Sequence, residues 1–112
     1  ARHLESAGLS WDSTLSYADR PGFRCGTCRE YPLYDVAERR PLELIERPLV
    51  LMDCSLMDGR YMGLGTGAEA YDYAVGLKEK CRRFGGDFVI LWHNDRFVDP
   101  AEVELYRQIL KA

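Results

Sequence analysis

The sequence predicts an α/β fold, a partial and distorted (β/α) barrel in which a βαβ crossover joins parallel strands. Two short apolar runs, residues 49–52 and residues 88–92, carry this prediction, and an ionisable side chain follows each of them. A segment with helical periodicity separates the two runs, as a right-handed crossover between parallel strands requires. Functional groups are expected beyond the carboxyl ends of such strands.

The length, composition and charge of the chain exclude several classes of protein. The 112 residues suffice for one small domain or for a piece of a larger one. Hydrophobic residues make up 46% and charged residues 29%, which is ordinary for a folded chain and unlike a disordered one. The net charge is -3 and basic residues cluster only in pairs, so no nucleic-acid partner is expected. No apolar run reaches the roughly 18 residues of a membrane span, and no compartment is indicated.

The first half of the chain is expected to hold short elements between loops. Residues 2–7 are typical of a helix end that Gly8 closes. Residues 9–14 and 23–25 are predicted to be short extended segments. Residues 42–46 are expected to form a strand of their own, ahead of the apolar run that ends at Asp53.

The clearest helix follows a glycine-rich loop over residues 57–67. Thr66 and Glu69 have the spacing of a capping box, and Gly85 ends the segment. Its apolar positions recur at steps of four and three, at Ala70, Ala74, Leu77, Cys81 and Phe84.

A last helix is predicted after Asp99, which can serve as N-cap, with Pro100 at the first helical position. Four of its residues are expected to face inward: Leu105, Tyr106, Ile109 and Leu110.

His93 ends the second apolar run, and an imidazole can transfer a proton or bind a metal near neutral pH. The run before it is expected to be buried on both faces, as in a parallel sheet. Asp53 ends the first run, one βαβ unit earlier. We therefore expect Asp53 and His93 to lie side by side, with Asp53 orienting the imidazole. The alternative is that both residues simply begin polar loops.

Cys25 and Cys28 form a single C-x-x-C pair. Three interpretations are open: half of a zinc site completed by Cys54 and a histidine, a redox pair, or two packing residues in a loop. Arg24, next to the pair, suits a carboxylate or an anionic intermediate, because its guanidinium donates two parallel hydrogen bonds. A surface salt bridge is the alternative for Arg24.

Three segments occur in a recognisable order: GLSWDST at residues 8–14, GFRCGT at 22–27 and VILWHN at 89–94. This order resembles the second half of the polysaccharide deacetylases, carbohydrate esterases with a NodB homology domain. The resemblance implies a distorted (β/α) barrel and a metal-dependent hydrolase that removes acetyl groups from a glycan or a related amide. The implied cofactor is a divalent metal, with zinc the expected ion.

The resemblance also implies roles for individual residues. His93 would be the general acid that protonates the leaving amine, Arg24 would pair with the catalytic base aspartate, and Asp53 would tune the histidine. Trp92 would lie beside the acetyl pocket, and Tyr31 is the second expected substrate-binding residue.

The chain departs from the family pattern in two places. Residues 25–28 separate Arg24 from Tyr31 and Pro32, where the family has a proline-tyrosine pair directly after its arginine. The family's adjacent aspartates and two metal-binding histidines are also absent, and His3 is the only other histidine. We therefore expect residues 1–112 to be the C-terminal portion of a deacetylase-like domain. Its partner would be the N-terminal half of that domain, and the portion alone would be inactive and bind no metal.

A rival hypothesis belongs to another class. The chain would be a non-catalytic glycan-binding or structural module, in which Cys25, Cys28 and Cys54 hold a zinc ion.

Overall fold

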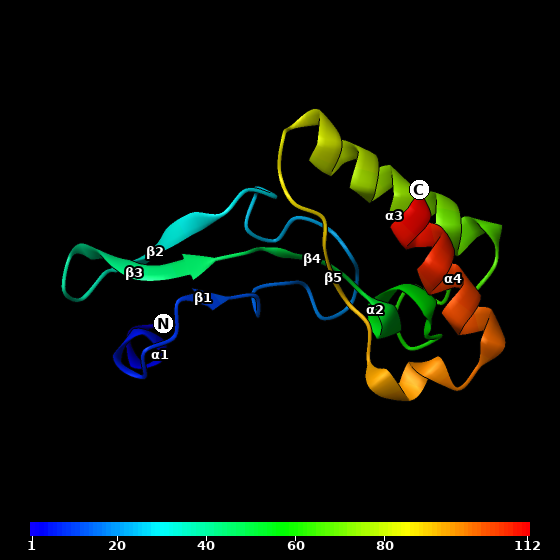
Figure 1. Ribbon diagram of the computed structural model, residues 1–112, viewed down its shortest axis with the longest axis horizontal. Helices are drawn as coiled ribbons and strands as arrows, with labels where there is room; N and C mark the ends of the chain where they lie inside the picture. Colours follow the sequence, from blue (N-terminus) through cyan, green and yellow to red (C-terminus); the bar gives the residue numbers. More distant parts are fainter.

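The computed structural model describes all 112 residues, and it is elongated, measuring 47 × 30 × 23 Å. A three-stranded sheet and the N-terminal helix α1 (Arg2–Ser6) form one end, and a two-stranded sheet with most of the helices forms the other (Figure 1). The prediction of an α/β fold is thus confirmed. The structure contains two small sheets and no closed barrel, so that part of the prediction is not confirmed.

The three-stranded sheet has the order β1-β3-β2. Strands β2 (Tyr31–Asp35) and β3 (Arg40–Glu46) form an antiparallel hairpin, and β1 (Trp11–Asp12) pairs with β3 in parallel. Leu42 and Leu44 on β3 are buried. The strand expected over 42–46 and the extended segment within 9–14 are both confirmed.

The short strand expected over residues 23–25 is wrong, because this segment is a turn. The N–H of Gly26 donates to the carbonyl of Phe23 over 3.0 Å, which closes the turn. Gly26 has a φ of 71°, a left-handed conformation that breaks an extended segment.

The βαβ unit is present as predicted. Strands β4 (Leu49–Met52) and β5 (Val89–Leu91) pair in parallel, and helix α3 (Ala68–Arg83) lies between them in the chain. Leu49, Val50 and Leu51 are buried, as expected of a covered strand. Burial on both faces is wrong for β5, where Leu91 is 40% exposed. Ile90 packs against the core, whereas Leu91 points to the opposite face of the strand, which is left partly exposed.

Helix α3 buries four of the five residues predicted for its apolar face. Phe84 is the exception, at 65% exposed, because it follows the last helical turn. The capping box is also wrong: the N-cap is Gly67, one position after Thr66, and no side chain caps the helix. That shift moves Glu69 out of the third helical position, from which it could bond back to the cap.

Helix α4 (Pro100–Lys111) begins as predicted, with Asp99 accepting a hydrogen bond from the N–H of Ala101 over 2.8 Å. Leu105 and Ile109 are buried, whereas Leu110 is 48% exposed, so its predicted inward position is wrong. Residue 110 lies about 100° around the helix from residue 109 and faces away from the core. No helix is both long enough and apolar enough to cross a membrane.

Candidate active site at the ends of β4 and β5

Asp53 and His93 lie next to each other at one edge of the two-stranded sheet. Asp53 directly follows β4 and begins the short helix α2 (Asp53–Met57). His93 follows β5 and precedes the 3-10 helix η1 (Asn94–Phe97). The parallel register pairs Met52 with Leu91, so both strands deliver their next residues to the same edge. The predicted proximity of Asp53 and His93 is confirmed.

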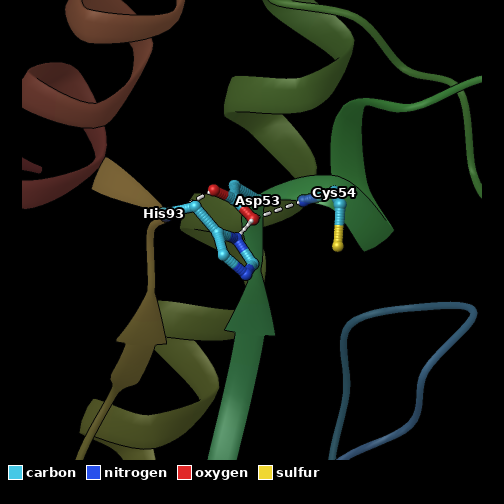
Figure 2. A group of neighbouring side chains, drawn as sticks. All are labelled: Asp53, Cys54 and His93. Atoms are coloured by element: carbon cyan, nitrogen blue, oxygen red, sulfur yellow. Dashed lines mark hydrogen bonds and ion pairs between the residues drawn. The ribbon is translucent and has the colours of Figure 1, made fainter. Parts of the chain in front are cut away.

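The Asp53 carboxylate is fully buried and accepts three N–H groups. Its Oδ1 accepts from Nδ1 of His93 over 2.7 Å and from the backbone N–H of Cys54 over 2.6 Å. Its Oδ2 accepts from the backbone N–H of His93 over 2.6 Å (Figure 2). One carboxylate therefore fixes both the backbone and the ring of His93.

This contact also determines where the His93 ring carries its proton. A carboxylate oxygen only accepts hydrogen bonds, so Nδ1 of His93 must donate. In the neutral ring, Nε2 then keeps its lone pair. The side chain of His93 is 47% exposed, and Figure 2 shows its second ring nitrogen pointing away from Asp53. Nε2 is thus available to exchange a proton with a bound molecule.

Cys54 is a third member of this group, and the sequence did not predict its place beside His93. Ligand atoms of Asp53, Cys54 and His93 all lie within 4.8 Å of one another. The thiol is half-buried and donates to Sδ of Met52 over 3.2 Å. Its position directly after Asp53 at a strand end is the sequence signal that points to it.

Arg96 holds the segment that follows His93. Its guanidinium donates two hydrogen bonds to Asp58, over 2.8 and 2.7 Å, and one to Glu102 over 3.1 Å. These carboxylates raise the pKa of Arg96 above its usual value, with the Asp58 hydrogen bonds as the main cause. The backbone N–H of Arg96 donates to the His93 carbonyl over 3.0 Å. Arg96 therefore ties η1 to the end of α2 and to α4, and so positions His93.

Replacement of Arg96 by alanine is expected to lower the free energy of unfolding by about 1–3 kcal/mol, because charged hydrogen bonds to two carboxylates are lost. Urea denaturation measures the effect. Arg107→Ala is the matched control, since Arg107 is exposed and makes no side-chain hydrogen bond or ion pair, and it should change stability by less than about 0.5 kcal/mol. Equal effects of the two substitutions would refute the positioning role of Arg96.

Arg24 lies apart from this group, in the loop between β1 and β2. Its guanidinium is exposed and donates to the carbonyl of Ser16 over 2.9 Å. It makes no ion pair within the chain and no hydrogen bond to Asp53 or His93. The structure thus brings together two of the three predicted catalytic residues, and the pairing of Arg24 with a base aspartate stays a prediction.

The two predicted substrate-binding residues belong to different parts of the structure, since Trp92 follows β5 and Tyr31 lies in the three-stranded sheet. Trp92 lies beside His93, half-buried, with its ring 5.2 Å from that of Tyr106, and its indole N–H is buried without a partner. Tyr31 begins β2 in the three-stranded sheet. A hydrogen bond with Cys25 is the main cause that raises the pKa of Tyr31 to about 12, and burial adds to it. Both substrate roles stay predictions.

The three cysteines of the zinc site in the rival hypothesis do not form a cluster in the structure. Cys54 belongs to the group with Asp53 and His93, the only cluster of metal-ligating side chains in the chain. Cys28 is buried beside Cys81 of α3, where burial is the main cause that raises the pKa of Cys81 to about 12. Cys25 lies near the carbonyl of Leu15, with 3.9 Å between sulfur and oxygen. These contacts support the packing interpretation of the C-x-x-C pair.

The divalent metal implied by the family resemblance does not fit the residues of this chain. The adjacent aspartates and the two histidines that would bind it do not occur in the sequence. Asp53 alone does not restore that set, because it is a single carboxylate and its oxygens already accept three N–H groups. No family model, curated protein or solved structure matches the chain.

Proposed function

We propose that His93, held in place by Asp53, is the general acid of a hydrolase that removes acetyl groups from an acetylated glycan or a related amide. One observation carries the proposal: a buried carboxylate binds both the Nδ1 and the backbone N–H of a histidine whose other ring nitrogen faces solvent. Acid–base catalysis needs a histidine oriented in this way, with a second group that holds its tautomer. The resemblance to polysaccharide deacetylases supplies the substrate class.

In the proposed mechanism, the base aspartate of the complete site takes a proton from a water molecule, which adds to the acetamide carbonyl carbon. His93 acts when the carbon–nitrogen bond of the resulting tetrahedral intermediate breaks, which leaves the acetyl group as acetate. The protonated ring donates the Nε2 proton to the departing nitrogen, which leaves as a neutral amine. The ring becomes neutral and keeps the proton on Nδ1, which remains hydrogen-bonded to Asp53. Asp53 stabilises the charged ring before this step and prevents it from turning. A positioned general acid of this kind contributes about 10²–10⁴-fold to the rate.

The remaining predicted residues enter the proposal through the family resemblance. Arg24 would pair with the base aspartate of the complete site, and Trp92 and Tyr31 would contact the substrate. The β4-α3-β5 unit would be part of a distorted (β/α) barrel in the complete domain. No step of the mechanism passes through a metal, because this chain lacks the ligands for the family's ion.

Replacement of His93 by glutamine in the full-length protein tests the proposal through its dependence on the leaving group. An amine leaves only with a proton, whereas a nitrophenolate leaves without one. The value of kcat/KM should fall about 10²–10³-fold on an N-acetylated glycan. It should fall by less than about tenfold on p-nitrophenyl acetate. Both rates are measured on the same enzyme preparations.

His3→Gln is the control, because His3 belongs to α1 at the other end of the molecule (Figure 1). It should leave both rates unchanged. An equal loss on the two substrates in His93→Gln, or no loss on the glycan, would exclude His93 as the general acid.

A further inference from the structure

The thiol of Cys54 lies beside His93 and Asp53 and has no part in the mechanism above. Its sulfur, a ring nitrogen of His93 and a carboxylate oxygen of Asp53 lie within 4.8 Å of one another. Figure 2 shows the sulfur and the free edge of the imidazole ring on the same side of Asp53. Sulfur and imidazole nitrogen are the ligands that zinc and similar soft cations prefer.

The distances decide which atoms are available to a cation. The 2.7 Å between Nδ1 of His93 and Oδ1 of Asp53 is a hydrogen-bond length. Two ligands of one tetrahedral zinc, each about 2.0–2.1 Å from it, lie roughly 3.3 Å apart. Nδ1 and Oδ1 are therefore not ligands of a shared ion. The two atoms that remain available as ligands of a cation are Sγ of Cys54 and Nε2 of His93.

We propose that Sγ of Cys54 and Nε2 of His93 bind a thiophilic divalent cation of the zinc class. Water fills the remaining coordination positions. The Cys54 thiol loses its proton to solvent on binding, and its hydrogen bond to Met52 breaks. Asp53 does not touch the ion but holds the ring by Nδ1, an arrangement that strengthens metal binding by histidine.

This site has a consequence for catalysis, and only that consequence rests on the proposed function. The ion takes the Nε2 lone pair of His93, so an occupied site cannot exchange a proton there. Zinc bound at Cys54 and His93 therefore inhibits the hydrolase, and a chelator restores its activity. The ion differs from the family's catalytic metal in its ligands and in its effect.

Cadmium titration of the reduced full-length protein tests the site without substrate. A cadmium–thiolate bond produces an ultraviolet charge-transfer band, and we expect a band that depends on Cys54. The band should disappear in Cys54→Ser and persist in Cys25→Ser, a half-buried thiol in another loop. His93→Gln should retain the thiol and shift the titration to higher cadmium concentrations.

The absence of a band in the wild type, or an unchanged band in Cys54→Ser, would refute the proposed site. An unchanged titration curve in His93→Gln would remove His93 from it. Zinc inhibition of acetyl hydrolysis is measured separately. A Cys54-dependent cadmium band in a protein without hydrolase activity would refute the proposed function and leave the metal site in place.

Discussion

Replacement of Asp53 by alanine is expected to lower the free energy of unfolding by about 3 kcal/mol or more. Asp53 is fully buried and accepts hydrogen bonds from the backbone N–H groups of Cys54 and His93. Each buried N–H that loses its acceptor costs about 1–3 kcal/mol. The His93 ring contributes less, because its side chain is 47% exposed and water can replace the lost partner. Urea denaturation followed by circular dichroism measures the change.

Two further variants separate the effects of shape, charge and position. Asp53→Asn keeps the shape of the side chain but places an amide NH₂ against one of the N–H donors, so an intermediate loss of stability is expected. Its acetyl hydrolysis should fall about as far as in His93→Gln, since the ring loses its orientation. Asp72→Ala is the matched control, an exposed aspartate on α3. A loss below about 1 kcal/mol in Asp53→Ala would contradict the hydrogen-bonding role.

Replacement of Glu46 by glutamine is expected to remove a large pH dependence of stability. Glu46 ends β3 and is fully buried. The parallel register places Asp12 directly opposite. One carboxyl oxygen accepts from the N–H of Leu15 over 3.3 Å, and the other has no partner. Burial is the main cause that raises the pKa of Glu46 to about 7, from its ordinary value of 4.5.

The raised pKa means that the folded protein binds the Glu46 proton more tightly than the unfolded chain does. The contribution of neutral Glu46 to stability is fully present below about pH 4.5 and is lost as the pH rises to about 7. At about 1.4 kcal/mol for each pH unit, the loss is about 3 kcal/mol. Above about pH 8, Glu46→Gln should therefore be about 3 kcal/mol more stable than the wild type, and near pH 4 the two should be similar.

Urea denaturation across this pH range measures the difference. Glu43→Gln is the control, because Glu43 lies on the same strand with an exposed side chain. It should follow the wild-type curve. Parallel curves for the wild type and Glu46→Gln would contradict the effect of burial on this carboxyl group.

Local patterns predicted the part of the fold that carries the site. The apolar runs before Asp53 and His93 and the periodicity of α3 are each contained in one segment, and the crossover rule then fixes their arrangement. The errors occurred where a distant contact or a shift of one residue decides the outcome. Leu91 is exposed because no element covers the face of β5 opposite to Ile90, and a sequence pattern within β5 does not contain that information.

The candidate site was predictable to the same extent. Asp53 and His93 followed from the strand ends, because neighbouring parallel strands deliver their ends to one edge. The role of Arg96 could not be predicted, because its partner Asp58 is 38 residues away in the sequence and only the fold brings them together. The place of Cys54 was not predicted, because the C-x-x-C motif suggested that Cys54 is a zinc ligand together with Cys25 and Cys28. The structure instead places its sulfur beside His93.

The central claim is that Asp53 holds the proton of His93 on Nδ1 and leaves Nε2 free for catalysis. Nitrogen NMR of the His93 ring in metal-free protein, at a pH where the ring is neutral, tests this most directly. We expect a protonated Nδ1 and an unprotonated Nε2 in the wild type, and a change toward protonated Nε2 in Asp53→Asn. A wild-type ring with its proton on Nε2 and none on Nδ1 would contradict the claim.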